Sequence, residues 1–191
     1  MLLKELYESY DNINLDSAYE LFRHSYEQAT GASWSKEKFL SRARNWTFYG
    51  DENGFVSVRK QNSGMIKLVG VAGSPKSIYK GIQELSAENK PIWGMVSGDL
   101  VPMAQKFGFI KPPAFVVKVI AKTIPASVLG GADYKVNNDG SITFSYADVG
   151  EATKFFIANK LYFKQQLTTM KDKTTDLAMK PVIAAIEFMV K

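Results

Sequence analysis

The sequence contains no cysteine and only one histidine, His24, among its 191 residues. Because disulfides and thiolate metal sites both need cysteine, the chain can form neither. A single histidine likewise excludes a metal site built from several histidines of one chain. Charged and polar residues surround His24 in the sequence, which predicts a surface or boundary position. The alternative is a role as a proton carrier. The sequence therefore predicts no metal site.

The chain also lacks long hydrophobic runs, since no apolar stretch reaches the about 20 residues of a membrane-spanning helix. Met1-Leu2-Leu3 is followed at once by Lys4 and Glu5, which is not the pattern of a signal peptide. Hydrophobic residues make up 46% and charged residues 23% of the chain, as in ordinary globular proteins. We therefore expect a protein with a real core in a cytoplasm, or in a particle assembled in one.

Charge is distributed unevenly along the sequence. The net charge is +5, yet residues 1–30 carry −4, which leaves +9 on the remainder. A basic body suits a phosphate-bearing ligand, nucleic acid or an acidic partner. The alternative is a solvated, lysine-rich surface with no ligand.

Two helices and a hairpin are expected in the first third of the chain. Asn14 or Asp16 caps the first helix, and Ser35 caps a shorter second one. Strands follow over residues 46–49 and 55–60, joined by a glycine-bounded loop. This order predicts an antiparallel pair of strands preceded by helices.

The next stretch has the clearest succession of elements. An apolar run over residues 65–72 has strand length, and Ser74 followed by Pro75 is a typical helix start. Apolar residues at helical spacing predict a helix over 75–86, and a short strand follows over 92–96. Two strands joined by a helix of that length are expected to be parallel neighbours.

The later part of the chain is less regular. The apolar run over residues 115–120 is short enough to be a strand or a helix, and its periodicity does not decide between them. Short strands over 134–136 and 142–146 flank an Asn-Asn-Asp-Gly sequence, which is a strong hairpin signal.

Two more helices are expected towards the C-terminus. Asp148 and Glu151 have the spacing of a capping box, which predicts a helix over residues 152–167. The polar residues 168–175 predict a turn, and a second helix is expected over 177–190, interrupted or restarted at a proline.

A helix over residues 100–107, ending in Lys106-Phe107-Gly108-Phe109, completes a strand, loop, helix, strand, helix order. This order resembles the acyl-CoA-binding half of the GNAT superfamily of N-acyltransferases, over residues 14–120. The resemblance implies an α/β fold with a GNAT-like mixed central sheet flanked by helices. It divides the chain into a GNAT-like domain, 1–146, and a C-terminal helical extension, 147–191.

The resemblance also implies where a cofactor would bind. In the family, a Gln/Arg-x-x-Gly-x-Gly/Ala loop opens the crossover helix and holds the pyrophosphate of acetyl-CoA on free N–H groups. The matching residues are Gly73, Ser74, Lys76 and Ser77, but the Gly-x-Gly pair and the preceding Arg or Gln are absent, and Pro75 removes one donor. These residues form either a residual phosphate site or a well-capped structural helix.

The catalytic positions of the family also differ here. The tyrosine that protonates the leaving thiolate corresponds to Ala104, and an asparagine near the start of that helix corresponds to Ser97. The strand that carries the general base holds only Lys67, while Tyr79 or Tyr49 could substitute in space. Positioned acids and bases contribute large rate factors, so these departures argue against ordinary acetyl transfer.

The sequence is therefore interpreted as a non-catalytic, GNAT-like structural or interaction protein that needs no cofactor. It is similar to degenerate GNAT-like proteins of tailed bacteriophages, including internal virion proteins. Its partners are expected to be other protein subunits or further copies of itself, bound through the C-terminal helices. Nucleic acid is an alternative partner for Lys154, Lys160 and Lys164, without a supporting aromatic or Arg-rich motif. The alternative function is an acyl-CoA-dependent N-acetyltransferase with an atypical active site.

The prediction that the protein assembles with other subunits rests on the apolar residues of the C-terminal segment. Full burial of a large apolar side chain contributes roughly 1.5–3 kcal/mol, so such residues need to be covered. Those that need cover are Phe155, Phe156, Tyr162, Phe163, Val182, Ile183, Ile186 and Met189.

Overall fold

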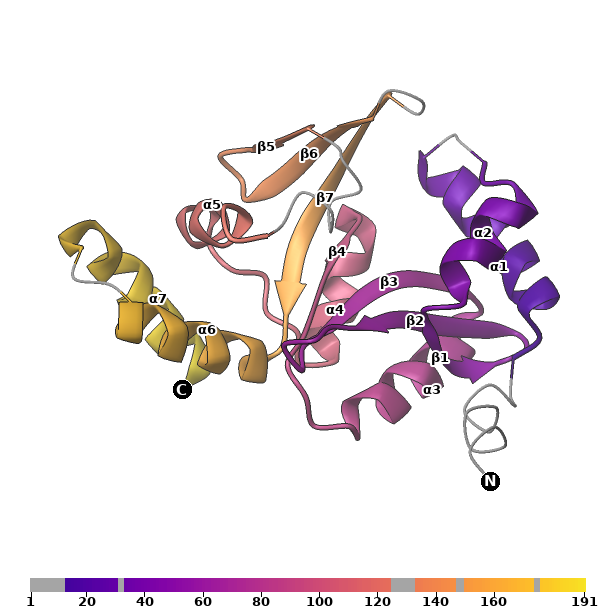
Figure 1. The fold of residues 1–191 in the computed structure, drawn as a ribbon, viewed down its shortest axis with the longest axis horizontal. Coiled ribbons are helices and arrows are strands. Elements are labelled where there is room, and N and C mark those ends of the chain that lie inside the picture. The colour runs from indigo at the N-terminus through magenta and orange to yellow at the C-terminus, as the bar shows by residue number, and fades with distance from the viewer. Residues whose placement is uncertain (1–12, 31–32, 125–132, 147–149, 174–175) are drawn as a thin grey trace. The chain divides into compact units, whose positions relative to one another are not determined.

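The computed structural model describes residues 13–30, 33–124, 133–146, 150–173 and 176–191. It confirms the predicted α/β fold class, because strands that pair into sheets are flanked by helices (Figure 1). By internal packing the chain divides into two compact units, Met1–Lys90 and Pro91–Lys191. We call them the N-terminal and the C-terminal unit and describe each by itself. The predicted boundary between residues 146 and 147 stays a prediction.

The N-terminal unit contains the helices and strands that the sequence predicts. They are α1 (Leu15–Thr30), α2 (Lys36–Ala43), β1 (Thr47–Asp51), β2 (Gly54–Lys60), β3 (Ile66–Gly73) and α3 (Pro75–Ser86). The three strands form an antiparallel sheet with β2 in the middle. Asn14 caps α1, since its Oδ1 accepts a hydrogen bond from the Asp16 amide at 2.8 Å. The Oγ atoms of Ser35 and Ser74 accept bonds at the starts of α2 and α3.

Helices cover both faces of the sheet in this unit. Successive side chains of a strand point to opposite faces, and every residue of β2 from 54 to 58 is buried. Phe55 packs in a cluster with residues of α1 and α2, whereas a side chain at Gly54 would meet Ser77 of α3. Thus α1 and α2 lie on one face and α3 lies on the other (Figure 1).

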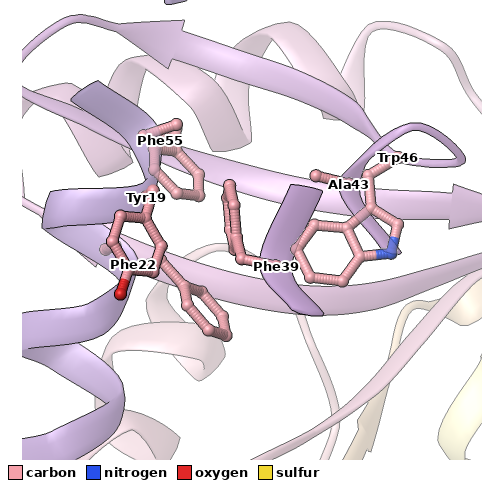
Figure 2. Packing of buried hydrophobic residues seen from close by; sticks show 8 residues of the cluster. Tyr19, Phe22, Phe39, Ala43, Trp46 and Phe55 are labelled. Atoms are coloured by element: carbon pink, nitrogen blue, oxygen red, sulfur yellow. The ribbon is translucent and has the colours of Figure 1, made fainter. Parts of the chain in front are cut away.

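An aromatic cluster joins α1 and α2 to this sheet. Figure 2 shows the ring of Phe39 between those of Phe22 and Trp46, with ring centroids 5.1 Å and 5.7 Å away. Each such aromatic pair contributes about 0.5–1.5 kcal/mol beyond the area that it buries. The cluster therefore fixes both helices on the sheet.

The C-terminal unit has a four-stranded sheet and several helices. They are β4 (Ile92–Val96), the 3-10 turn Gly98–Leu100, α4 (Val101–Lys106), α5 (Ala114–Ala121), β5 (Asp133–Val136), β6 (Ser141–Tyr146), β7 (Gly150–Ala158), α6 (Lys160–Lys173), the 3-10 turn Leu177–Met179 and α7 (Lys180–Val190). The strands lie in the order β4-β7-β6-β5, and every pair is antiparallel. The expected parallel pairing of β3 with β4 would join the two units and stays a prediction.

The predicted helix over residues 152–167 is wrong in its first half, whereas residues 160–167 lie in helix α6. Residues Gly150–Ala158 form β7, which pairs with β6 on one side and β4 on the other. The β-branched and aromatic residues Thr153, Phe155, Phe156 and Ile157 favour a strand once neighbouring strands pair with them. This pairing on both sides prevails over the local capping signal. Asp148, the first residue of the predicted capping box, lies outside the described residues.

The boundaries of two other elements also differ from expectation. Helix α6 continues through most of the predicted turn to Lys173, so the C-terminal helical segment consists of α6 and α7. The undecided run over residues 115–120 lies in a helix, α5. Between β7 and α6, the Asn159 Oδ1 accepts bonds from the amides of Ile92 and Tyr162, each at 3.0 Å. This side chain therefore joins β4 to the start of α6.

Candidate functional site

The predicted phosphate site lies where β3 meets α3. Gly73 ends β3 with φ +93°, and a side chain there would collide with the backbone of Asn53, in the turn between β1 and β2. The Ser74 amide donates to the carbonyl oxygen of Asn53 at 2.8 Å. This amide is therefore engaged within the protein.

The two serines of the site are bonded to each other. The Ser77 amide donates to Ser74 Oγ at 3.3 Å, and Ser74 Oγ donates to Ser77 Oγ at 2.9 Å. Ser77 is only 4% exposed. Its hydroxyl also bonds to the Asp51 carboxylate, and this bond is the main cause of a pKa of Asp51 below its usual value.

Asp51 supplies a negative charge at the start of α3. Lys80 Nζ lies 3.8 Å from its carboxylate, and Lys76 adds a weaker attraction. An anion at a helix N-terminus is stabilised by the helix dipole. A phosphate at the same place would meet a carboxylate of like charge. The geometry therefore favours the capped structural helix among the two interpretations of this sequence.

The structure brings Gly73, Ser74 and Ser77 together, whereas the Lys76 side chain is exposed. Sequence reasoning missed Asp51 and Asn53, which complete the arrangement from the turn between β1 and β2. The predicted hairpin located this turn, but no local signal placed it over the start of α3.

The two tyrosines that could replace the missing acid are differently placed. Tyr49 donates a hydrogen bond to Glu88, which also pairs with Lys60 at 3.1 Å and Lys90 at 3.2 Å. Burial, followed by this bond to Glu88, raises the pKa of Tyr49. A tyrosine with a raised pKa is a poorer proton donor. Tyr79 lies on α3 and is 50% exposed.

The remaining positions of the family's chemistry hold no strong acid or base. Ala104 is buried in α4, and Ser97 precedes the short 3-10 turn before that helix. The residues that the structure describes include no cluster of three His, Asp or Glu side chains able to hold a metal ion. His24 is exposed, as expected, and its Nε2 lies 3.1 Å from Gln28 Nε2.

The three lysines of the nucleic-acid alternative, all within the predicted helix over residues 152–167, lie on two different elements. Lys154 lies on β7 and is half-buried, and burial lowers the pKa of its amine. Lys160 and Lys164 are exposed on α6. The three lysines therefore do not form the single helical face that the nucleic-acid alternative requires.

A second candidate site lies on α7, which has apolar residues on two opposite faces. Val182 and Ile186 are buried on the face that packs within the unit. Phe188 is 79% exposed on the other side, and Leu177 in the preceding turn is 71% exposed. We call the exposed residues Leu177, Pro181, Ala184 and Phe188 the outer face of α7.

No protein-family model matches this chain, and no curated protein matches it. Within the described residues, no helix has both the length and the apolar character needed to cross a membrane.

Proposed function

We propose that this protein is a non-catalytic structural or interaction protein that assembles with protein subunits through its C-terminal helices. The observation that carries the proposal is the outer face of α7, where Phe188 is 79% exposed. Large exposed apolar groups that lie together usually mark an interface. The opposite face of the same helix is already buried, so the outer face is not needed for packing within the unit.

The start of α3 supports the non-catalytic part of the proposal. Its serine hydroxyls and the Ser74 amide bond to groups of the chain, and Asp51 supplies the anion. An N-acetyltransferase, the alternative function, would have to hold cofactor phosphates at Gly73, Ser74, Lys76 and Ser77 beside that carboxylate. Calorimetry with acetyl-CoA at millimolar concentration is expected to give no binding heat. Binding that is lost in a Lys76→Ala, Ser77→Ala variant would establish the alternative.

Assembly is tested on the full chain in extracts of its natural source. We expect the wild-type protein to sediment in a complex larger than its own 21.3 kDa. The Phe188→Asp variant should sediment as the free chain, because it replaces the most exposed apolar ring of the outer face with a hydrated carboxylate, whose burial against a partner is costly. Tyr79→Asp is the matched control, an exposed aromatic residue in the other unit. A complex that survives Phe188→Asp would refute assembly through α7.

We extend the proposal to a bacteriophage virion component, on the likeness of the sequence to degenerate GNAT-like phage proteins. Quantitative mass spectrometry of purified particles tests this extension. A constant copy number per particle would support it, whereas recovery of the chain only outside the particles would contradict it.

A further inference from the structure

We infer that the occupant of the outer face of α7 is a second copy of this chain, whose α7 packs antiparallel and crosses at Ala184. The inference rests on the proposed function, because it names the partner at the same surface. Three observations carry it: the spacing of the outer face, the small residue at its centre and the pattern of charge beside it.

The outer face forms a straight stripe along the helix. Pro181, Ala184 and Phe188 follow one another at spacings of three and four residues, which places them on adjacent turns of one side. Ala184 lies in the middle, where a small side chain allows two helix axes to approach closely. Phe188, one turn further on, would then lie against Pro181 and the aliphatic stem of Lys180 in the partner.

Charges beside the stripe are self-complementary in the antiparallel arrangement. Lys180 and Glu187 are seven residues apart, so they lie on the same side of the stripe. Lys180 lies four residues before Ala184 and Glu187 three residues after it. A two-fold axis at Ala184 therefore places Lys180 of each copy beside the partner's Glu187, and the contact occurs twice.

A parallel pair of helices would lack this attraction. A two-fold axis along parallel helices places Lys180 and Glu187 of the two copies on opposite sides of the seam, so neither residue meets an opposite charge of the partner. The charges thus select one orientation and a closed, two-fold dimer. Glu187 is also held at 2.5 Å by Lys171 of α6, which orders its carboxylate before the partner arrives.

The expected dimer is weak on its own. A helix of 11 residues offers one narrow face. Interfaces below about 1,200 Å² belong to weak or transient complexes. We therefore expect a dissociation constant in the micromolar range for the purified chain. Self-association should be measured at protein concentrations that span this range.

Cross-linking tests the crossing point. The chain has no cysteine, so an Ala184→Cys variant carries a single thiol. Mild oxidation with copper phenanthroline is expected to give a covalent dimer of Ala184→Cys at micromolar concentration. The control is Thr168→Cys, which is exposed on α6 and should stay monomeric. Equal yields for the two variants, or no dimer with Ala184→Cys, would overturn the inference.

Charge exchange tests the pairing across the axis. Sedimentation should show that Lys180→Glu and Glu187→Lys each weaken self-association about tenfold or more, since each places like charges together. An equimolar mixture of the two variants should restore association, because every contact is then between opposite charges. Thermal melting of each variant checks that it is folded. A mixture that stays as weak as its components would refute the pairing.

The failure of this inference and that of the proposed function give different results. If the purified wild-type chain stays monomeric while Phe188→Asp still disrupts the complex in native extracts, a different protein occupies the outer face and the inference is wrong. If Phe188→Asp leaves the native complex unchanged, the proposed function itself is wrong.

Discussion

The start of α3 and the outer face of α7 both have the composition of a binding site, but they differ in what the chain itself supplies. At α3, the hydroxyls of Ser74 and Ser77 bond to each other, and the Asp51 carboxylate accepts the remaining bond. At α7, Phe188 and Leu177 remain 79% and 71% exposed. The polar group of residues has its partners within the unit, whereas the apolar group has most of its surface in solvent.

This difference determines which region is the better candidate for a ligand. A buried polar group without a hydrogen-bond partner lowers the stability of the fold by about 1–3 kcal/mol. Serines at the start of a helix are therefore interpreted first as caps that bond within the chain. Apolar side chains that form an exposed stripe do not contribute to packing within the unit in this way. Burial against a partner would remove them from water. The comparison therefore favours a structural role for the start of α3 and makes the outer face of α7 the better candidate for a partner.

The largest expected effect concerns the core that holds the N-terminal helices. Phe39 is fully buried in the aromatic cluster of that unit. Phe39→Ala is expected to lower the free energy of unfolding by about 3–5 kcal/mol, because it removes a buried ring and leaves a cavity. Urea denaturation measures the loss, and Phe39→Leu, which keeps more of the volume, should lose less. A loss below 1 kcal/mol for the alanine variant would contradict this packing.

The next effect tests how closely the turn between β1 and β2 approaches α3. Gly73→Ala places a methyl group against the Asn53 backbone at a residue with φ +93°. We expect a loss of about 1–3 kcal/mol from the strained backbone, with the collision adding to it. Gly64→Ala is the control, because φ is also positive there but a methyl group would have open space. Equal losses at the two glycines would show that the close approach is absent.

A smaller effect should appear in the pH dependence of stability. The pKa of the Asp51 carboxyl is lowered in the folded protein, first by the bond to Ser77. The stabilisation that it gives is therefore present above its unfolded pKa of about 3.9 and is lost as the pH falls through the lower folded value. Asp51→Asn should be less stable than wild type at pH 7, and the difference should be smaller at about pH 3, below the unfolded pKa. Denaturant unfolding at both pH values checks this, and a constant difference would exclude Asp51 as the cause.

The two candidate sites also differ in how far the sequence could predict them. Helix α3 has the predicted bounds, because Ser74, Pro75 and the helical spacing are all local signals. Its role as a self-contained cap depends on Asp51, which reaches it only through folding of the β1–β2 hairpin. Local signals failed at β7, where pairing with β6, the preceding strand, and with β4, which is distant in sequence, decides the structure.

The outer face of α7 could be predicted only in part. The sequence indicated an apolar helix over residues 177–190 and its buried stripe, of which Val182 and Ile186 are fully covered. It could not show that the side of the helix with Phe188 is exposed, because an apolar residue there is equally compatible with a second buried face. The packing of α7 against α5 and α6 determines which side remains exposed.

The smallest expected change in stability distinguishes the two phenylalanines most directly. Phe188→Ala removes the same ring as Phe39→Ala, but from a side chain that is 79% exposed. The substitution removes little buried apolar surface and leaves no cavity. The free energy of unfolding of the monomer should therefore change by less than about 0.5 kcal/mol. Self-association measured by sedimentation should nevertheless weaken at least about tenfold, since aromatic anchors carry much of the binding energy of an interface. A loss of stability comparable with that of Phe39→Ala would mean that Phe188 belongs to the core of the unit, and α7 would then have no outer face to offer a partner.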